Sequence, residues 1–209
     1  MFLLKAIVIN AGPKRRDGNA QLVKEAAKGA ESVGASVKYV DLYKLDLHGC
    51  MNCGVCKNDD KVGKCYWKDE TSPLIEEILA SDVLIIASPI FFTEPTSHYR
   101  ALIERLIYCI VSFERGNVFK DKINVGLFYT IEYPKAMFEK NVRPHLKQSE
   151  SLLEMFNGEV NIYTSRIITK NERNKSLDNP ELESKIKKKE NEFAEDLDNA
   201  FEIAVKLCK

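Results

Sequence analysis

Four cysteines in one short stretch are the residues whose types and spacing most clearly indicate chemistry. The stretch "GCMNCGVCKNDDKVGKC" holds Cys50, Cys53, Cys56 and Cys65, and the whole chain of 209 residues has only 6 cysteines. Thiolates separated by two residues on a turning backbone can wrap one face of an iron–sulfur cubane, and a later cysteine can supply the fourth ligand. The spacing therefore indicates a candidate [4Fe-4S] site at these four residues.

Two other interpretations of the cysteines remain open. A structural zinc site usually takes two separate ligand pairs, and three consecutive short steps would crowd its tetrahedral geometry. The four residues could also be reduced thiols, or an adventitious disulfide, in a loop. Cys109 and Cys208 lie outside the stretch, and we interpret them as packing or surface residues.

A basic loop is the second stretch that suggests chemistry. In "NAGPKRRDGNAQLV" the cations Lys14, Arg15 and Arg16 stand between an apolar run and a helical pattern. Free amides and the helix dipole make the N-terminus of a helix a site for anions. The loop therefore predicts phosphate binding, although an ordinary basic surface loop would look similar. It contains neither a dinucleotide fingerprint nor a P-loop.

The elements that must position these residues alternate along the chain. Short apolar runs rich in β-branched residues predict five buried strands, at about 3–10, 35–42, 82–90, 122–130 and 158–164. Helical spacing predicts helices at about 19–33, 72–79, 99–111, 135–156 and from Asn179 and Pro180 onward. Gly34 stops the first of these, Ser72 and Pro73 begin the second, and Pro144 breaks the fourth. Alternating strands and helices predict an α/β fold, a flavodoxin-like, doubly wound, five-stranded parallel sheet of order 2-1-3-4-5 with helices on both faces. Ligands of such sheets bind outside the carboxyl ends of the strands.

We expect residues 1–209 to form a single domain, because the length is ordinary for one core. Within it we expect a Cys-rich insertion at about 42–72 and a C-terminal helix at about 180–208. The insertion is much longer than a usual strand-to-helix connection, which favours a functional role.

Charge and hydropathy narrow the classes of partner that the chain could bind. Lys+Arg and Asp+Glu are both 31, so the formal net charge is zero and no global field attracts nucleic acid or an anionic membrane. No apolar run is long enough to span a bilayer, and the first residues lack the features of a signal peptide. We therefore expect a cytoplasmic protein with neither nucleic acid nor membrane as partner. In that compartment clustered cysteines are more often metal-binding or catalytic than structural disulfides.

Three stretches together resemble one family. "GPKRRDGNAQLV" after "IVIN" resembles the flavin phosphate loop of NADPH-dependent FMN reductases and iron–sulfur flavoproteins, which reads Gly-Ser-Pro-Arg, a short gap, then Gly-Asn-Thr. "SDVLIIASPIFFTEPTSHYRALIERL" is similar to that family's "ADLIVFGSPVYF…LKAFIDR" segment. The cysteine stretch resembles its "CxxCxxC…GKC…DD" insertion. The resemblance runs in register across at least residues 3–130.

The resemblance implies one FMN at the point where the strand order reverses. It places around the phosphate Gly12, Pro13, Lys14, Arg15, Gly18, Asn19 and Ala20. It places along the isoalloxazine ring Ser88, Pro89, Ile90, Phe91 and Phe92, with Thr130 and Glu132 as further candidates. The family often has hydroxyl residues where this chain has Gly12 and Ala20, so two hydrogen bonds to phosphate are expected to be missing.

The function we predict is an FMN-dependent oxidoreductase, in which NAD(P)H reduces the flavin and a small-molecule or protein acceptor takes the electrons. The cofactor carries this chemistry, so no side chain is assigned a catalytic role. One alternative is an iron–sulfur flavoprotein that carries electrons from ferredoxin without a nicotinamide, and another is a binding module without flavin. The resemblance also implies that a neighbouring subunit completes the flavin site, in a homodimer or homotetramer.

Overall fold

The central feature of the fold is a parallel sheet. The computed structural model describes residues 3–58, 61–169, 172–174 and 180–209. Its main strands are β1 (Lys5–Asn10), β2 (Ser36–Asp41), β3 (Val83–Phe91), β7 (Ile123–Ile131) and β8 (Asn157–Arg166). They are hydrogen-bonded in the order β2-β1-β3-β7-β8, and every neighbouring pair is parallel. The predicted order 2-1-3-4-5 is therefore confirmed.

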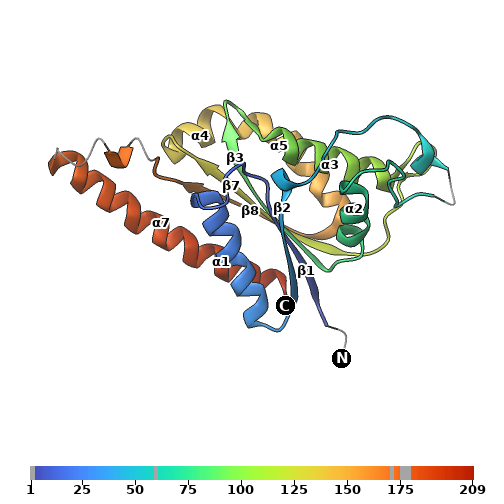
Figure 1. Ribbon diagram of the computed structural model, residues 1–209, viewed down its shortest axis with the longest axis horizontal. Coiled ribbons are helices and arrows are strands. Elements are labelled where there is room, and N and C mark those ends of the chain that lie inside the picture. Colours follow the sequence, from blue (N-terminus) through green and yellow to red (C-terminus); the bar gives the residue numbers. More distant parts are fainter. Residues whose placement is uncertain (1–2, 59–60, 170–171, 175–179) are drawn as a thin grey trace.

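Helices cover both faces of this sheet (Figure 1). One face carries α1 (Gly18–Ser32) and α7 (Pro180–Leu207). The other carries α2 (Thr71–Leu79), α3 (Ser97–Ile110), α4 (Lys135–Asn141) and α5 (Arg143–Ser151). This arrangement confirms the doubly wound fold class. Asn179, expected at the start of the last helix, lies outside the described residues.

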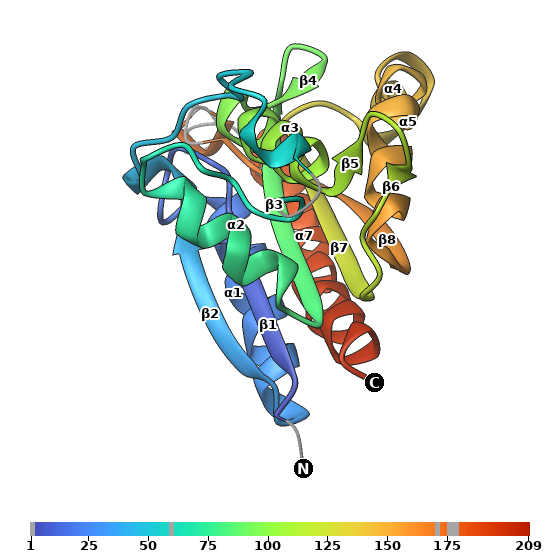
Figure 2. The same cartoon turned by 90° about the vertical axis from the view of Figure 1, so that its right-hand side faces the viewer.

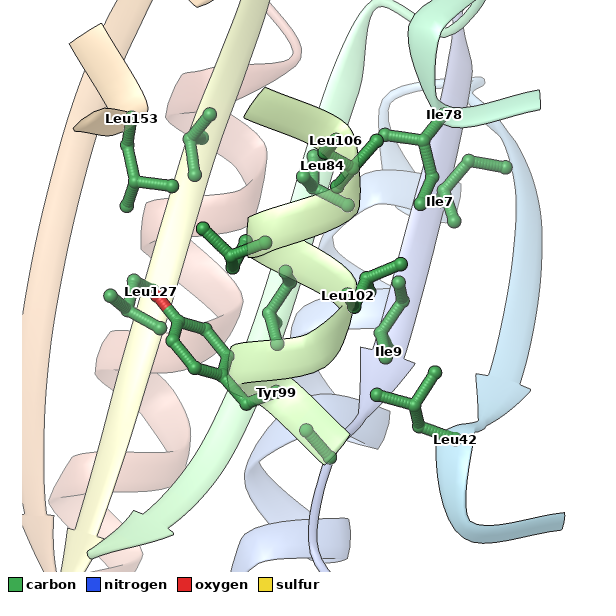
Figure 3. Packing of buried hydrophobic residues seen from close by; sticks show 14 of the residues in the cluster. Ile7, Ile9, Leu42, Ile78, Leu84, Tyr99, Leu102, Leu106, Leu127 and Leu153 are labelled. Carbon is green, nitrogen blue, oxygen red and sulfur yellow. The ribbon is translucent and has the colours of Figure 1, made fainter. Parts of the chain in front are cut away.

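The two covered faces divide the core into two clusters. Successive side chains of a strand point to opposite faces, so Ile7 and Ile9 of β1 pack toward α2 and α3, whereas Ala6 and Val8 pack toward α1 and α7. Figure 3 shows Tyr99, Leu102 and Leu106 of α3 lying over the strands on the first face. Burial on both faces explains why the strands are nearly continuous apolar runs.

Two residues determine where the helix α1 begins and ends. The side chain of Asp17 caps the start by accepting a hydrogen bond from the backbone N–H of Ala20 at 3.1 Å. At the other end Gly34 takes a positive φ of 88°, and its N–H donates to the carbonyl of Glu31. A left-handed glycine is a common helix stop, so the predicted role of Gly34 is confirmed.

Proline sets the break between α4 and α5. The helix α4 ends at Asn141, Val142 intervenes, and Pro144 lies in the first turn of α5. Proline has no N–H to donate, so it is tolerated in a first turn but not inside a helix. The predicted interruption near Pro144 is thus observed.

The predicted cap of α2 is wrong by two residues. We expected Ser72 to cap the helix, but it begins at Thr71. The carboxylate of Asp69 accepts hydrogen bonds from the backbone N–H groups of Thr71 at 3.1 Å and Ser72 at 3.0 Å. Asp69 therefore satisfies the free amides that a capping residue would otherwise satisfy.

Several short elements are absent from the sequence-based prediction. They are the strands β4 (Glu94–Pro95), β5 (Val111–Ser112) and β6 (Gly116–Asn117) and the 3₁₀ turns Leu42–Lys44, Val55–Lys57 and Leu152–Phe156. All but the last have two or three residues, too few to show a periodic pattern, and Leu152–Phe156 lies at the end of the helical stretch predicted to 156. β4 pairs antiparallel with the end of β3, which turns the chain back as a hairpin.

The candidate flavin loops lie at one end of the molecule. Figure 2 shows the β4 hairpin and the start of the Cys-rich insertion at the carboxyl edge of the sheet, with the C-terminus at the opposite end. The loop between β1 and α1 leaves that same edge, because parallel strands share a direction. Among the described helices, none combines the length and the apolar character needed to cross a membrane.

Candidate functional site

The loop between β1 and α1 presents a row of unused backbone amides. From Lys14 to Asn19, no backbone N–H donates a hydrogen bond to any residue that the structure describes. Residues 13–16 are exposed, and the first turn of α1 follows directly. Free amides beside a helix N-terminus suit an anionic group, so the loop fits the phosphate of FMN.

Gly12 anchors this loop, and little room remains there for a side chain. Its N–H donates to Oδ1 of Asn10 at 3.0 Å. A Cβ at this position would lie 3.0 Å from Nδ2 of Asn19 and 3.3 Å from Cδ of Pro89. Three chain segments therefore approach closely at Gly12.

The side chain of Asn19 points into the protein. Its Nδ2 donates to Oδ1 of Asn10 at 2.7 Å and to the carbonyl of Ala87 at 3.0 Å, and its Oδ1 accepts from Oγ1 of Thr130 at 3.1 Å. Asn19 thus ties together the carboxyl ends of β1, β3 and β7. Asn19 has only its backbone N–H left for a phosphate, and the buried hydroxyl of Thr130 is already engaged.

Gly18 and Ala20 face other parts of the protein. A Cβ on Gly18 would lie 2.4 Å from Cγ2 of Ile167 and 3.2 Å from Cζ of Phe193, so a residue of α7 covers this point. Ala20 is fully buried, and its N–H is taken by Asp17. Among the predicted phosphate residues, Ala20 therefore offers neither a side chain nor a free amide.

One cation of the loop, Arg15, stands beside a partly buried carboxylate. Nε of Arg15 lies 3.8 Å from Oδ2 of Asp41, at the end of β2. Burial alone would raise the pKa of Asp41, but hydrogen bonds, first of all from Asn10, outweigh it and lower the pKa. Asp41 is therefore ionised at neutral pH and draws Arg15 toward β2, whereas Lys14 and Arg16 have no described ion pair.

The turn after β3 exposes two aromatic rings. Ser88, Pro89 and Ile90 are buried, whereas Phe91 is 48% exposed and Phe92 is 96% exposed. Both rings therefore lie outside the core. The strand ends here, and Phe92 takes a left-handed φ of 60° at the tip of the hairpin.

Thr96 joins this turn to the first loop. Its backbone N–H donates to Oγ of Ser88 at 3.1 Å, and its hydroxyl donates to the carbonyl of Ala11 at 2.7 Å. The same oxygen accepts from the N–H of Tyr99 and caps α3. Ser88 therefore serves the geometry of the hairpin, and Phe91 and Phe92 are the side chains of this turn that reach the surface.

One small pocket brings the cysteines together. It has a volume of about 20 Å³, and Cys50, Cys53, Cys56 and Cys65 all line it. A fifth thiol, Cys109 of α3, lines it as well. Its other walls are Met51, Gly54, Tyr66, Trp67, Arg105 and Tyr108. Cys109 thus does more than fill the core, as we had interpreted it, because it faces the same space as the predicted ligands.

Arg105 of α3 holds both arms of the insertion against the helix. Its side chain is 1% exposed and forms a two-pronged ion pair with Asp69, with N–O distances of 2.5 and 3.0 Å. It also donates to the carbonyl of His48 at 3.2 Å and to Sγ of Cys65 at 3.2 Å. A fully buried cation therefore sits directly beside the fourth predicted ligand.

The rest of the insertion rests on the same half of α3. The N–H of Gly63 donates to the carbonyl of Cys109 at 2.8 Å. Nζ of Lys57 donates to the carbonyl of Tyr108 in α3 and, at 2.6 Å, to that of Val111 just beyond the helix. The N–H of Cys50 donates to the carboxylate of Glu104 at 2.9 Å. Polar contacts from α3 thus position the cysteine pocket, because the insertion forms no long element of its own.

The thiols of the pocket differ in their electrostatic surroundings. Burial raises the pKa of Cys56 and of Cys109. Burial also acts on Cys65, but hydrogen bonds from the backbone of Trp67 and from Arg105 outweigh it and lower the pKa. The pocket therefore combines sulfurs that favour the neutral form with one that is stabilised as an anion.

The donor types of this pocket, thiols that face one space, are those that iron–sulfur clusters take. Within residues 3–58, 61–169, 172–174 and 180–209, no three His, Cys, Asp or Glu side chains are arranged to hold one metal ion. That arrangement does not match a tetrahedral zinc site. The thiolates of a cubane bind different iron atoms and need not converge in this way, and sulfur ligands within an apolar wall suit such a cluster.

The pocket does not lie beside the candidate flavin loops of its own chain. The insertion leaves the carboxyl end of the second strand, so we expected its cysteines beside the flavin, but the two places lie toward opposite ends of α3. Ser97 at the start of α3 is next to the hairpin, and Cys109 lies twelve residues further, or about 18 Å along the axis. A groove of about 640 Å³ runs along the same helix, and its walls include Glu94 and Pro95 of the hairpin and Lys57 and Tyr108 beside the pocket.

Sequence reasoning missed residues that carry no obvious chemical motif. Arg105 and Cys109 fall on the buried stripe of α3, three and seven residues after Leu102, so a charge on that face was the available signal. Thr96 stands one residue before α3 begins, as a capping residue should, although the helical pattern in the sequence starts only at Tyr99. Asn10 carried no comparable local signal.

Comparison with known proteins places these features in a wider group. A family model described as NADPH-dependent FMN reductase matches residues 4–161. An iron-sulfur flavoprotein of Methanocaldococcus jannaschii is 24% identical over 123 residues, which is 59% of this chain and 62% of the relative. An iron-sulfur flavoprotein of Archaeoglobus fulgidus is 26% identical over 104 residues, 50% of this chain and 46% of the relative. The chain thus spans less than two thirds of the length of these curated relatives.

Solved structures show the same fold at low identity. The NAD(P)H:quinone oxidoreductase from Methanothermobacter marburgensis superposes with a TM-score of 0.71 at 11% identity, covering 99% of this chain and 100% of the other. A flavone reductase gives a TM-score of 0.61 at 15% identity, covering 98% of this chain and 63% of the other. Both are flavodoxin-like in the arrangement of sheet and helices that they share with this chain.

Proposed function

The chain belongs to the NADPH-dependent FMN reductase family, and from that premise we propose that it is an FMN-dependent oxidoreductase that takes electrons from NAD(P)H and passes them to a further acceptor. One observation carries this proposal, the row of unused amides from Lys14 to Asn19 at the carboxyl edge of the sheet. Bound FMN would supply the electron-transfer chemistry.

In this function the loop between β1 and α1 binds the phosphate of FMN, and the β4 hairpin covers its flavin ring. The amides of residues 14–19 donate to the phosphate, and Lys14 and Arg16 add positive charge at its exposed side. Phe91 lies at the edge of the hairpin, where an apolar ring would cover its exposed half. Gly12 and Asn19 keep the loop in place without contacting the cofactor through side chains.

A visible spectrum tests the proposal. We expect the purified chain to be yellow, to release FMN rather than FAD on denaturation, and to bleach when NADH or NADPH is added without oxygen. A colourless protein that takes up no FMN would contradict the assignment and favour a binding module without flavin. A panel of quinone, azo, nitro and protein acceptors, added after bleaching, identifies the class that restores the colour.

We further propose that the functional form is a homodimer or homotetramer. Phe92 is almost completely exposed although it is a large apolar residue, and Phe91 beside it is half exposed. Adjacent exposed aromatic rings at a candidate site are typical of a surface that a ligand or partner covers. Light scattering should give a mass that is a multiple of 23.8 kDa, and a flavin-bound monomer would contradict the proposal.

The second candidate function is an iron–sulfur flavoprotein that carries electrons from a protein donor. The pocket lined by five cysteines favours it, as do the relatives that bear this name. Cys50, Cys53, Cys56 and Cys65 would hold the cluster, which supplies one-electron chemistry when bound. Anaerobic reconstitution should give about four irons per chain, and the two candidates separate on whether nicotinamide or reduced ferredoxin bleaches the flavin.

A further inference from the structure

We propose that Arg105 is a positioning residue of the cysteine site, which holds Cys65 at the pocket and donates an N–H···S hydrogen bond to that sulfur when it binds iron. This inference rests on the second candidate function. It concerns a residue of α3 that lies forty positions after Cys65 in the sequence.

The geometry of the guanidinium leaves it little freedom. Nη2 of Arg105 lies 3.2 Å from Sγ of Cys65, 3.0 Å from Oδ1 of Asp69 and 2.9 Å from Oγ of Ser72. Nη1 lies 2.5 Å from the other oxygen of Asp69 and 3.2 Å from the carbonyl of His48. Since both nitrogens have fixed partners, the sulfur is held by a donor that cannot swing away.

Burial makes this ion pair costly unless every partner is present. The side chains of Arg105 and Asp69 are 1% and 2% exposed. A buried pair must offset the loss of hydration through good geometry and additional hydrogen bonds. Here those bonds come from both arms of the insertion, at His48 and at the segment from Cys65 to Ser72. The charge is therefore placed where the insertion closes on α3.

A donor at this position would act on a bound cluster in two ways. Partners that hydrogen-bond to metal ligands fix their orientation and increase the retention of the metal. Hydrogen bonds and positive charge at the sulfurs also favour the reduced, more negative state and so raise the reduction potential. Lysine keeps the charge but lacks the planar fork, so it cannot reproduce the contacts with Cys65 and Asp69 together.

The test compares three variants of the full-length chain after anaerobic reconstitution with ferrous iron and sulfide. In Arg105→Lys the N–H···S contact is lost. In Asp69→Asn the guanidinium remains, although the buried pair is weakened. Arg100→Lys, on an exposed position of the same helix, is the matched control. Iron content, release of iron to a chelator and the midpoint potential by electron paramagnetic resonance are measured for each.

We expect Arg105→Lys to release iron about tenfold faster than the wild type and to shift the midpoint potential to a more negative value. Asp69→Asn should keep the potential or shift it to a more positive value, because a negative charge near the cluster is removed. Arg100→Lys should match the wild type.

Three results would overturn the inference in distinguishable ways. Iron bound by Arg105→Lys with an unchanged potential would show that Arg105 is not a donor to the ligand, while the cluster itself stands. Equal negative shifts in Arg105→Lys and Asp69→Asn would show only a structural role for the pair. If the wild type takes up no iron, the second candidate function fails, and the role of Arg105 fails with it.

Discussion

Thr130 donates a hydrogen bond to the side-chain oxygen of Asn19 at 3.1 Å, across 111 residues of sequence. The same amide reaches Asn10 and the carbonyl of Ala87, so one buried side chain joins three strand ends at the candidate flavin edge. The first loop is therefore held in place from beneath, and its outward amides are left free.

Asn19→Ala should destabilise the fold by about 2–4 kcal/mol, because it removes three buried hydrogen bonds and leaves the hydroxyl of Thr130 without an acceptor. Urea unfolding followed by circular dichroism measures this change. Gln21→Ala, at an exposed position of the same helix, is the control and should change stability by less than about 0.5 kcal/mol. A loss below about 1 kcal/mol for Asn19→Ala would show that the three bonds are not coupled to the fold.

Arg15→Gln should weaken FMN binding about two- to tenfold at low salt, and less at high salt, because screening reduces exposed charge interactions. Arg15 is drawn toward Asp41, so its effect is expected to be modest. Flavin fluorescence quenching at two salt concentrations measures the affinity. Lys28→Gln, an exposed cation at the other end of α1, is the control and should leave the affinity unchanged.

Phe92→Gly should leave the melting temperature of the flavin-free chain unchanged or slightly higher, because glycine adopts the left-handed φ of this turn without strain. The same change should weaken flavin binding or subunit association, since it removes the exposed ring at the candidate site. Calorimetry and light scattering measure the two effects. Phe113→Gly provides the comparison, because its ring is 77% exposed but lies away from the hairpin. Equal behaviour of the two variants would argue against a role for Phe92.

Asp69 should make stability fall in acid. Burial acts to raise the pKa of Asp69, but the hydrogen bond and charge of Arg105 outweigh it, so the pKa in the folded chain lies below its unfolded value. The ionised carboxylate therefore stabilises the fold above about pH 4, and this contribution is lost as the pH falls through the lower folded pKa.

Asp69→Asn should cost about 3 kcal/mol at pH 7, because the buried charge of Arg105 loses its partner. The difference from the wild type should shrink below about pH 4, where the wild-type carboxyl is protonated as well. Urea midpoints at neutral and acidic pH measure it. Glu76→Gln disrupts an exposed pair with Lys64 and should cost less than about 1 kcal/mol. A pH-independent difference for Asp69→Asn would show that Asp69 does not titrate with folding.

Much of the fold could be predicted because its signals are local. The apolar runs of β1 and β3 and the helical stripe of α3 each lie within a few turns of chain, where spacing alone reports which faces are buried. Alternation of these elements implied a parallel sheet, and parallel strands bring the first loop and the turn after β3 to one edge. Gly34 and Pro144 marked helix ends through backbone chemistry that each residue carries by itself.

The direction in which polar side chains point had to come from packing between distant segments. Asn19 matched a phosphate motif, yet its amide turns inward because Asn10, Ala87 and Thr130 offer partners there. Ser88 likewise serves Thr96 rather than the surface. A motif reports residue types, whereas a hydrogen bond depends on where the partner's backbone has been placed.

The cysteine site shows most clearly the difference between what a local sequence pattern reports and what the packing of distant segments decides. Spacing grouped four thiols, but Cys109 and Arg105 joined them only when α3 packed under the insertion. Arg105 is 57 residues from His48 and 36 from Asp69, distances over which no sequence periodicity extends. Burial of that cation is stable only with all of its partners assembled, so the complete fold, rather than any local pattern, decided its place.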